Sequence, residues 1–341
     1  MNEASDRLVH RWLVASAVAV VLAVAIGGIT RLTESGLSIT EWRPVSGVLP
    51  PLSDAAWQDA YARYLTIPQA QSLHRGITMA EFRAIFWWEW FHRLLARLVG
   101  LVLALPYFVL LVRGKLRVEH RWRLLLLPLL AAAQGALGWY MVKSGLAGRS
   151  TVSQYRLTAH LGMALVIYAV CIWTMLDLGA RRLQAERIPG LLRRAIPWAL
   201  GFTLLTILSG GFVAGLRGGL MFNTFPLMGG QVVPPGYQMS GIGWRNAFEN
   251  PIAAQFHHRL LALGTATLIL WLAALGRRPG VPTPLKSATT AAGLAALLQV
   301  GLGIATLLLV VPVALGVLHQ LTALLLFTTM LVATHRAKTP A

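Results

Sequence analysis

The chain has 341 residues, of which 56% are hydrophobic and 12% are charged, so it is too apolar for an ordinary soluble domain. The formal net charge is +18, but the basic residues gather in short segments between long apolar runs, which argues against nucleic-acid binding. The single cysteine, Cys171, lies within an apolar run, which excludes a disulfide framework, a zinc–cysteine cluster and Cys-x-x-Cys-His haem attachment.

Eight apolar runs have the length that a helix needs to cross a bilayer. In chain order they cover about residues 12–29, 86–112, 124–142, 157–178, 196–213, 252–275, 288–310 and 312–334. The first run is longer than the apolar core of a typical signal peptide and is interpreted as a retained span. Only a tight turn near Val311-Pro312 separates the last two runs, which should form a hairpin. The sequence therefore predicts an all-α polytopic membrane protein with eight transmembrane helices.

The connections between the runs predict the orientation, because cytoplasmic loops carry an excess of lysine and arginine. The amino terminus, the connections after spans two, four and six, and the carboxyl tail hold most of these charges: Arg7 and Arg11; Arg113, Lys115, Arg117, Arg121 and Arg123; Arg181, Arg182, Arg187, Arg193 and Arg194; Arg277, Arg278 and Lys286; Arg336 and Lys338. Both termini are therefore expected in the cytoplasm. The long connections 31–85 and 214–251 lie on the outer face, where they can form caps over the helices.

A short pattern occurs twice, once in each half of the chain. Residues 89–97 are echoed by 255–263, so that His92 and Arg93 match His258 and Arg259, while Gln255 takes the place of Glu89. Further echoes match residues 134–138 with 299–303, and residues 160–165 with 319–324. This predicts two pseudo-symmetric four-helix bundles, residues 1–190 and 191–341.

Four histidines lie near the outer ends of the even-numbered spans: His92, His160, His258 and His319. Paired imidazoles from facing helices are typical axial ligands of haem, whereas structural zinc would need one cluster of four ligands with thiolates that this chain lacks. The predicted pairs are His92 with His160 and His258 with His319. His10, His74, His120 and His335 are expected on the solvated surface instead.

Charged residues accompany the first of these histidines. On a helix Glu89, His92, Arg93 and Arg97 share one face, where ionisable groups within a span usually mark a site. Arg93 and Arg259 are suited to bind haem propionates, because guanidinium groups bind carboxylates in a bidentate way. The alternative for Arg93 is an ion pair with Glu89, one helical turn earlier.

Several strings resemble the haem A synthases of the bacterial and mitochondrial cytochrome oxidase assembly family. They are residues 27–38, 42–47 and 81–93, followed by 222–228, the Gln255-Phe256-x-His258-Arg259 motif and 318–320. The resemblance covers nearly the whole chain. Some members of that family carry a cysteine pair in the first outer loop; this chain has none there, so a disulfide-dependent step is not expected.

The resemblance implies an eight-helix enzyme of the bacterial inner membrane that oxidises the C8 methyl of haem O to the formyl of haem A for cytochrome c oxidase assembly. It implies a substrate site in the amino-terminal half, at His92 and His160, and a haem b in the carboxyl-terminal half, at His258 and His319. Haem O synthase is the expected upstream partner, and the electrons pass to an acceptor that the sequence does not identify. The chain could also form a homo-oligomer.

With two histidines on each iron, oxygen activation there is hard to arrange, so removal of electrons followed by addition of water fits better. The methyl carbon would become hydroxymethyl, then a gem-diol that loses water to give the aldehyde. Glu89 is the expected catalytic group: it could stabilise positive charge at the carbon, accept protons or bond transiently to the carbon. The alternatives are a non-catalytic haem carrier and a dihaem b-type electron-transfer protein. A transporter is disfavoured, because the ionisable residues cluster near one face rather than at mid-bilayer.

Overall fold

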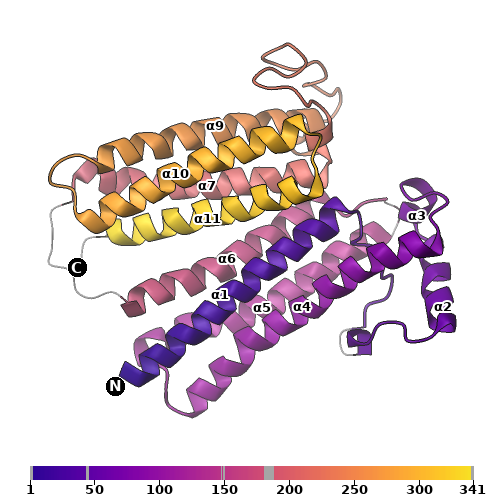
Figure 1. Ribbon diagram of the computed structural model, residues 1–341, viewed down its shortest axis with the longest axis horizontal. Coiled ribbons are helices and arrows are strands. Elements are labelled where there is room, and N and C mark those ends of the chain that lie inside the picture. The colour runs from indigo at the N-terminus through magenta and orange to yellow at the C-terminus, as the bar shows by residue number, and fades with distance from the viewer. Residues whose placement is uncertain (1–2, 44–45, 147, 149, 180–187, 339–341) are drawn as a thin grey trace. The chain divides into compact units, whose positions relative to one another are not determined.

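The computed structural model describes residues 3–43, 46–146, 148, 150–179 and 188–338 (Figure 1). In this part of the chain it contains eleven α-helices, three short 3₁₀ helices and no β-strand. Eight helices are long and apolar enough to cross a membrane: α1 (Glu3–Leu32), α4 (Met79–Val112), α5 (Val118–Leu146), α6 (Gln154–Gly179), α7 (Gly190–Gly215), α9 (Pro251–Gly276), α10 (Thr283–Leu308) and α11 (Val313–Ala337). The predicted all-α class and the eight spans are confirmed, whereas the pseudo-symmetry of the halves stays a prediction.

Some sequence features fall outside the described residues. These are Pro44 and Val45, within the second family-like string, and Arg181, Arg182 and Arg187, which contribute to the expected cytoplasmic charge after span four.

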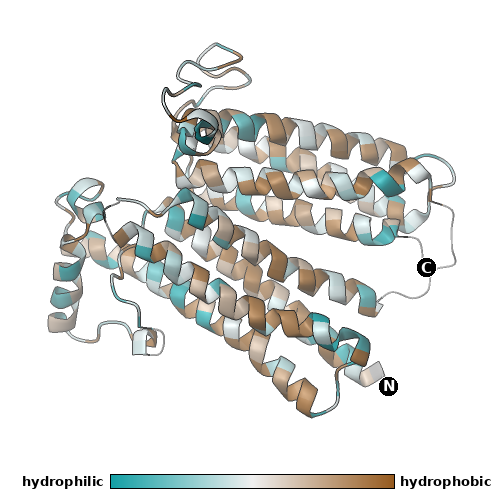
Figure 2. Ribbon diagram, turned by 180° about the vertical axis from the view of Figure 1, so that it is seen from behind, coloured by the Kyte–Doolittle hydropathy of each residue, from teal (hydrophilic) through white to brown (hydrophobic). Residues whose placement is uncertain are grey.

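The long helices have the surface expected of membrane spans. Apolar residues dominate their length (Figure 2), and large side chains of α4 point outward, with Leu101 60% and Leu105 61% exposed. Polar capping extends α4 beyond its apolar run, because Thr78 and Glu81 form a reciprocal capping box. Asn250 caps α9 in a similar way by accepting a hydrogen bond from the Ile252 amide.

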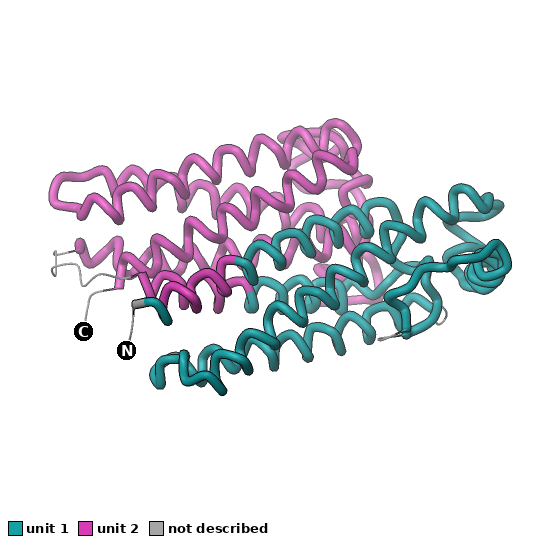
Figure 3. Tube along the Cα trace, turned by 60° about the horizontal axis from the view of Figure 1, so that its bottom comes forward, with its two compact units in different colours: residues 1–5, 15–167 teal, residues 6–14, 168–341 magenta. Residues whose placement is uncertain are grey.

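The chain forms two compact units (Figure 3). Unit 1 comprises Met1–Ser5 and Ala15–Ile167, and unit 2 comprises Asp6–Val14 and Tyr168–Ala341. The prediction of two functional halves that meet at residue 190 stays a prediction.

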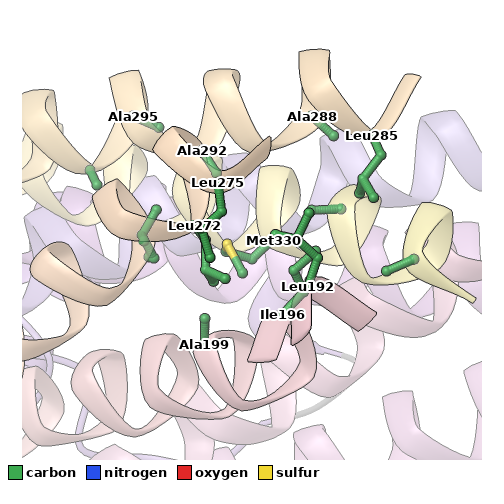
Figure 4. Close-up of a cluster of buried hydrophobic side chains, with 14 of the residues drawn as sticks. Leu192, Ile196, Ala199, Leu272, Leu275, Leu285, Ala288, Ala292, Ala295 and Met330 are labelled. Carbon is green, nitrogen blue, oxygen red and sulfur yellow. The ribbon is translucent and has the colours of Figure 1, made fainter. Parts of the chain in front are cut away.

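The core of unit 2 lies toward one end of its antiparallel helices (Figure 4). It joins the first half of α7 and of α10 to the second half of α9 and of α11, through Leu192, Ile196, Ile269, Leu272, Leu285, Ala288, Ala292, Met330 and Ala333, among others. Small alanines on α10 allow the helices to approach closely. His258 and His319 occupy the opposite halves of their helices, so this core supports their end of the bundle without filling it.

In unit 1, the outer connection folds into a cap with its own core. Helices α2 (Asp54–Leu65) and α3 (Pro68–Ser72) pack on the start of α4 through a cluster that includes Leu37, Trp57, Tyr64, Phe82 and Phe86. The Tyr64 hydroxyl is fully buried and lies 2.5 Å from His74 Nδ1. Burial raises the pKa of Tyr64, and the nearby charges of Glu89 and Glu34 raise it further, so the phenol stays protonated as a hydrogen-bonding group.

The second outer connection contains η2 (Gly218–Leu220), η3 (Gly243–Arg245) and α8 (Asn246–Glu249), while η1 (Ser46–Val48) belongs to the first. The predicted hairpin of the last two spans is confirmed, with α10 ending at Leu308 and α11 starting at Val313. Val310 and Val311 of its turn both have φ near +60°. Such angles are costly for β-branched residues, so the tight hairpin is built at the expense of local strain.

The expectation of solvated surface histidines is correct only for His10, which is exposed. His74, His120 and His335 are partly buried. His74 contacts Tyr64, and His335 Nε2 lies 2.8 Å from an Asp177 carboxylate oxygen. The prediction missed the burial of His74 and His335 because folding brings polar partners to them; for His120 the partner is the neighbouring Glu119.

Candidate functional site

Each of the four candidate ligand histidines packs against a glycine of a neighbouring span. A Cβ atom added to that glycine would lie roughly 0.5 to 1 Å closer to the imidazole Cε1 than two carbon atoms in favourable contact. The distances from such a Cβ to Cε1 are 3.0 Å for Gly27 and His92, 3.1 Å for Gly138 and His160, 3.1 Å for Gly210 and His258, and 2.9 Å for Gly303 and His319. Each of the four imidazoles therefore has the same kind of neighbour, a glycine whose missing side chain makes room for the ring.

The structure also brings the predicted partners together. In unit 1, His160 lies within electrostatic range of His92, and in unit 2 His319 lies within electrostatic range of His258. Each unit thus holds one pair of imidazoles contributed by two different helices. That arrangement can supply two axial ligands to one iron.

The ring nitrogens are consistent with metal ligation. His92 Nδ1 and His160 Nδ1 are buried and have no hydrogen-bond partner among the described residues. In unit 2, Ser209 Oγ lies 2.8 Å from His258 Nδ1, and Gln299 Nε2 lies 3.2 Å from His319 Nδ1. A buried nitrogen without a partner is costly unless another group binds there. The unpartnered nitrogens of His92 and His160 therefore fit a haem ligand site in unit 1, whereas in unit 2 the fit rests on the two imidazoles and their glycine neighbours.

Glu89 is 2% exposed and lies one helical turn before His92. Its Oε2 accepts hydrogen bonds from the Ser38 hydroxyl and the Ile39 amide, each at 2.7 Å. Its Oε1 accepts from Arg93, at 3.0 Å from Nε and at 2.6 Å from a terminal nitrogen. Four hydrogen-bond donors, two of them N–H groups of the Arg93 guanidinium, hold this carboxylate in place.

Arg93 links three parts of unit 1. Besides pairing with Glu89, it donates to the Ile39 carbonyl at 2.7 Å and to the Glu41 carbonyl at 2.9 Å. The Glu89–Arg93 ion pair, weighed from the sequence as the alternative role of Arg93, is thus present. A propionate-binding role for Arg93 stays a prediction, as it does for Arg259.

Arg259 repeats this arrangement in unit 2. It donates to the Phe222 carbonyl at 2.8 Å and to the Thr224 carbonyl at 2.7 Å. In both units, the arginine that follows the candidate ligand histidine holds two carbonyls, two residues apart, in the outer connection. We call each of these arrangements an arginine clamp.

The difference between Glu89 and Gln255 matches a difference in polarity of their partners. Position 89 faces only donors: a hydroxyl, an amide and a guanidinium. Gln255 instead donates from Nε2 to the Phe222 carbonyl at 3.0 Å. A carboxylate suits the first environment and an amide suits the second. The mismatch between Glu89 and Gln255 therefore has a structural cause, in addition to any chemical role of Glu89.

Two further residues connect the caps to the spans. His257 Nε2 lies 2.9 Å from the Tyr237 hydroxyl, and Arg97 donates to the Arg43 carbonyl at 2.9 Å. These contacts, the four glycines and Ser38 were missed from the sequence. The doublets Gly27-Gly28 and Gly210-Gly211 were the available signal for two of the glycines, because glycine in a helix interior usually reflects close packing.

Comparison of the sequence with known proteins identifies the family of this chain. Relatives named "Heme A synthase" include one from Sinorhizobium medicae, 46% identical over 94% of this chain and 87% of its own length. Another, from Nitrosospira multiformis, is 44% identical over 96% and 92%, and one from Parvibaculum lavamentivorans is 40% identical over 98% and 96%. The profile described as "Cytochrome oxidase assembly protein" matches residues 10–331. This eight-span chain therefore belongs to the cytochrome oxidase assembly protein family.

Proposed function

We propose that this protein is a haem A synthase, which oxidises the C8 methyl of haem O to a formyl group for cytochrome c oxidase assembly. The proposal is supported by near full-length relatives of that name and by the residues at the site. The single observation that carries it is the recurrence, in both units, of two imidazoles from different helices that are each packed against a glycine. Such a site suits a tetrapyrrole iron.

In this proposal, the two sites have different occupants. His92 and His160 bind the iron of the substrate, and His258 and His319 bind haem b. When bound, haem b supplies one-electron redox chemistry. Residues 1–190 then form the substrate half and residues 191–341 the haem b half.

Glu89 is the proposed catalytic group, and its hydrogen bonds suggest how it works. A carboxylate held by four donors must lose one of these hydrogen bonds before it can accept a proton or bond to carbon. A fixed negative charge can still stabilise an electron-poor methyl carbon until water adds. Of its donors, only the Ser38 hydroxyl can rotate away and also accept a proton. Ser38 is therefore the partner through which a proton could pass.

The same proposal includes the setting of the protein. The proposed location is the bacterial inner membrane, and the distribution of basic residues supports an orientation with both termini in the cytoplasm. The chemistry requires a supplier of haem O, for which a haem O synthase is the proposed partner, and an electron acceptor. Assembly as a homo-oligomer also belongs to the proposal.

The decisive experiment is to express the chain in bacteria that make haem O but no haem A, and to identify the extracted haems by chromatography and mass spectrometry. Haem A, with hydroxymethyl haem as an intermediate, is expected. A haem-loaded protein that leaves haem O unchanged would contradict the proposal and would favour a carrier or an electron-transfer protein.

A further inference from the structure

A small cavity of about 290 Å³ lies beside the candidate substrate site of unit 1. It is lined by residues of the outer connection and of α4 and α5: Thr40, Glu41, Trp42, Arg93, Trp139, Val142, Lys143 and Leu146. Arg93 directly follows His92, and Trp139 directly follows Gly138, the glycine that contacts His160. Residues that line the cavity therefore adjoin His92 in the sequence and reach His160 through Gly138.

The charges around this cavity are not all free to bind a ligand. Arg93 is already committed to Glu89 and to two backbone carbonyls. The Glu41 carboxylate is paired with Arg43 at 2.8 Å and lies 3.8 Å from Arg63. These pairs leave little unbalanced charge at the arginine side of the cavity.

Among the charged residues that line the cavity, Lys143 is the cation that is available to bind a ligand. Its side chain is exposed in the last turn of α5, and its ammonium lies 5.1 Å from the centre of the Trp139 ring. Within the described residues, it has no carboxylate partner at salt-bridge distance. An ammonium on a tryptophan face is held by a cation–π interaction while its hydrogens stay free to bind an anion.

The size and lining of the cavity restrict its occupant. A volume of about 290 Å³ is at the lower limit for a whole small-molecule ligand, so it suits a side arm rather than a tetrapyrrole ring. Apart from Thr40 and the paired Glu41 and Arg93, the walls are apolar and aromatic, and Lys143 is the available cation. Such a lining fits a short aliphatic chain that ends in a carboxylate.

We propose that Lys143 and this cavity bind a propionate of the tetrapyrrole substrate, while Arg93 positions the cap rather than the propionate. The proposal rests on the proposed function, because it takes the iron to lie between His92 and His160. It assigns the recognition of the substrate's carboxylate to α5, a helix that carries neither of these ligands.

The test compares ferric haem with its dimethyl ester, whose propionates carry no charge. Both are titrated into the full-length protein in phosphatidylcholine nanodiscs, and binding at this site is the low-spin absorbance that the His92→Ala variant loses. Lys143→Gln should weaken ferric haem about fivefold, the factor that corresponds to about 1 kcal/mol for a partly exposed ion pair. It should leave the ester unchanged. Lys143→Arg should restore ferric haem, and Lys115→Gln, in the connection between α4 and α5, is the control.

Other outcomes overturn the proposal. Equal weakening of both compounds would show that Lys143 shapes the site without binding a carboxylate, and no weakening of either would remove it from the site. An anionic lipid headgroup is the rival source of the same chemistry: if Lys143→Gln reduced only the phosphatidylglycerol retained by the protein, the cavity would be a lipid site. Failure of the wild type to bind either compound through His92 would also overturn it. Discrimination against the ester without haem A formation in cells would instead refute only the proposed function.

Discussion

Glycine at position 303 offers a direct test of the imidazole sites. In a Gly303→Ala variant, the new methyl carbon would start 2.9 Å from His319 Cε1, whereas carbon atoms in favourable contact are about 3.5–4.0 Å apart. The ring must then move by roughly 0.6 Å, which exceeds the tolerance of about 0.5 Å within which a functional constellation holds its geometry. Alanine also stabilises a helix by about 1 kcal/mol relative to glycine. The Gly303→Ala variant should therefore bind haem more weakly in unit 2, while the stability of the apoprotein is kept or raised.

Gly301 provides the matched control. It lies in the same helix, α10, and a Cβ added there meets nothing within 4 Å. Both variants would be purified and compared by haem content, by the low-spin absorbance spectrum and by thermal unfolding after haem removal. We expect Gly303→Ala to lose most of the haem of unit 2 without loss of apoprotein stability, and Gly301→Ala to keep its haem. A full haem complement with an unshifted spectrum in Gly303→Ala would refute the assignment of His319 as a ligand in this cradle.

Three further predictions address other parts of the site. Glu89→Gln, compared at equal protein level, should leave low-spin haem in place but accumulate haem O or hydroxymethyl haem in extracted pigment; abundant haem A would exclude a catalytic role, and loss of haem would indicate a structural one. His258→Ala should empty the second site while the first still binds haem in a spectral titration, and unchanged total haem content would contradict the ligand assignment. A cysteine at Ser240 should react with an impermeant thiol reagent once the outer barrier is open, whereas one at Ser287 should need inner-membrane lysis; the reverse order would invert the topology, and native Cys171 is buried and gives little background.

The transmembrane helices were predictable because each is a long apolar stretch, which a bilayer forces into a helix. Their ends were less predictable. The structure begins α4 at Met79, whereas the apolar run starts near residue 86. The Thr78-x-x-Glu81 capping box was readable in the sequence, but an apolar-run criterion does not register it.

The sequence singled out the four histidines because the same short pattern occurs in both halves, at the same depth in each span; their role as ligands stays a prediction. The partners of Glu89 were not. The hydrogen bond from Ser38 crosses 51 positions of sequence, through a connection without periodicity. The cap core around Tyr64 is likewise made by short helices whose apolar residues are too few to produce a clear pattern.

The arginine clamps have a consequence for how the outer connections can vary in sequence. Each guanidinium binds main-chain carbonyls, of Ile39 and Glu41 in one unit and of Phe222 and Thr224 in the other. Every amino acid supplies such a carbonyl, so this anchorage is indifferent to the side chains it holds. The first connection carries one exception, because Glu89 accepts the amide hydrogen of Ile39 and proline has none. At the clamped positions, the anchorage thus constrains the path of the backbone and not the identity of the side chains, which can vary while the clamp persists.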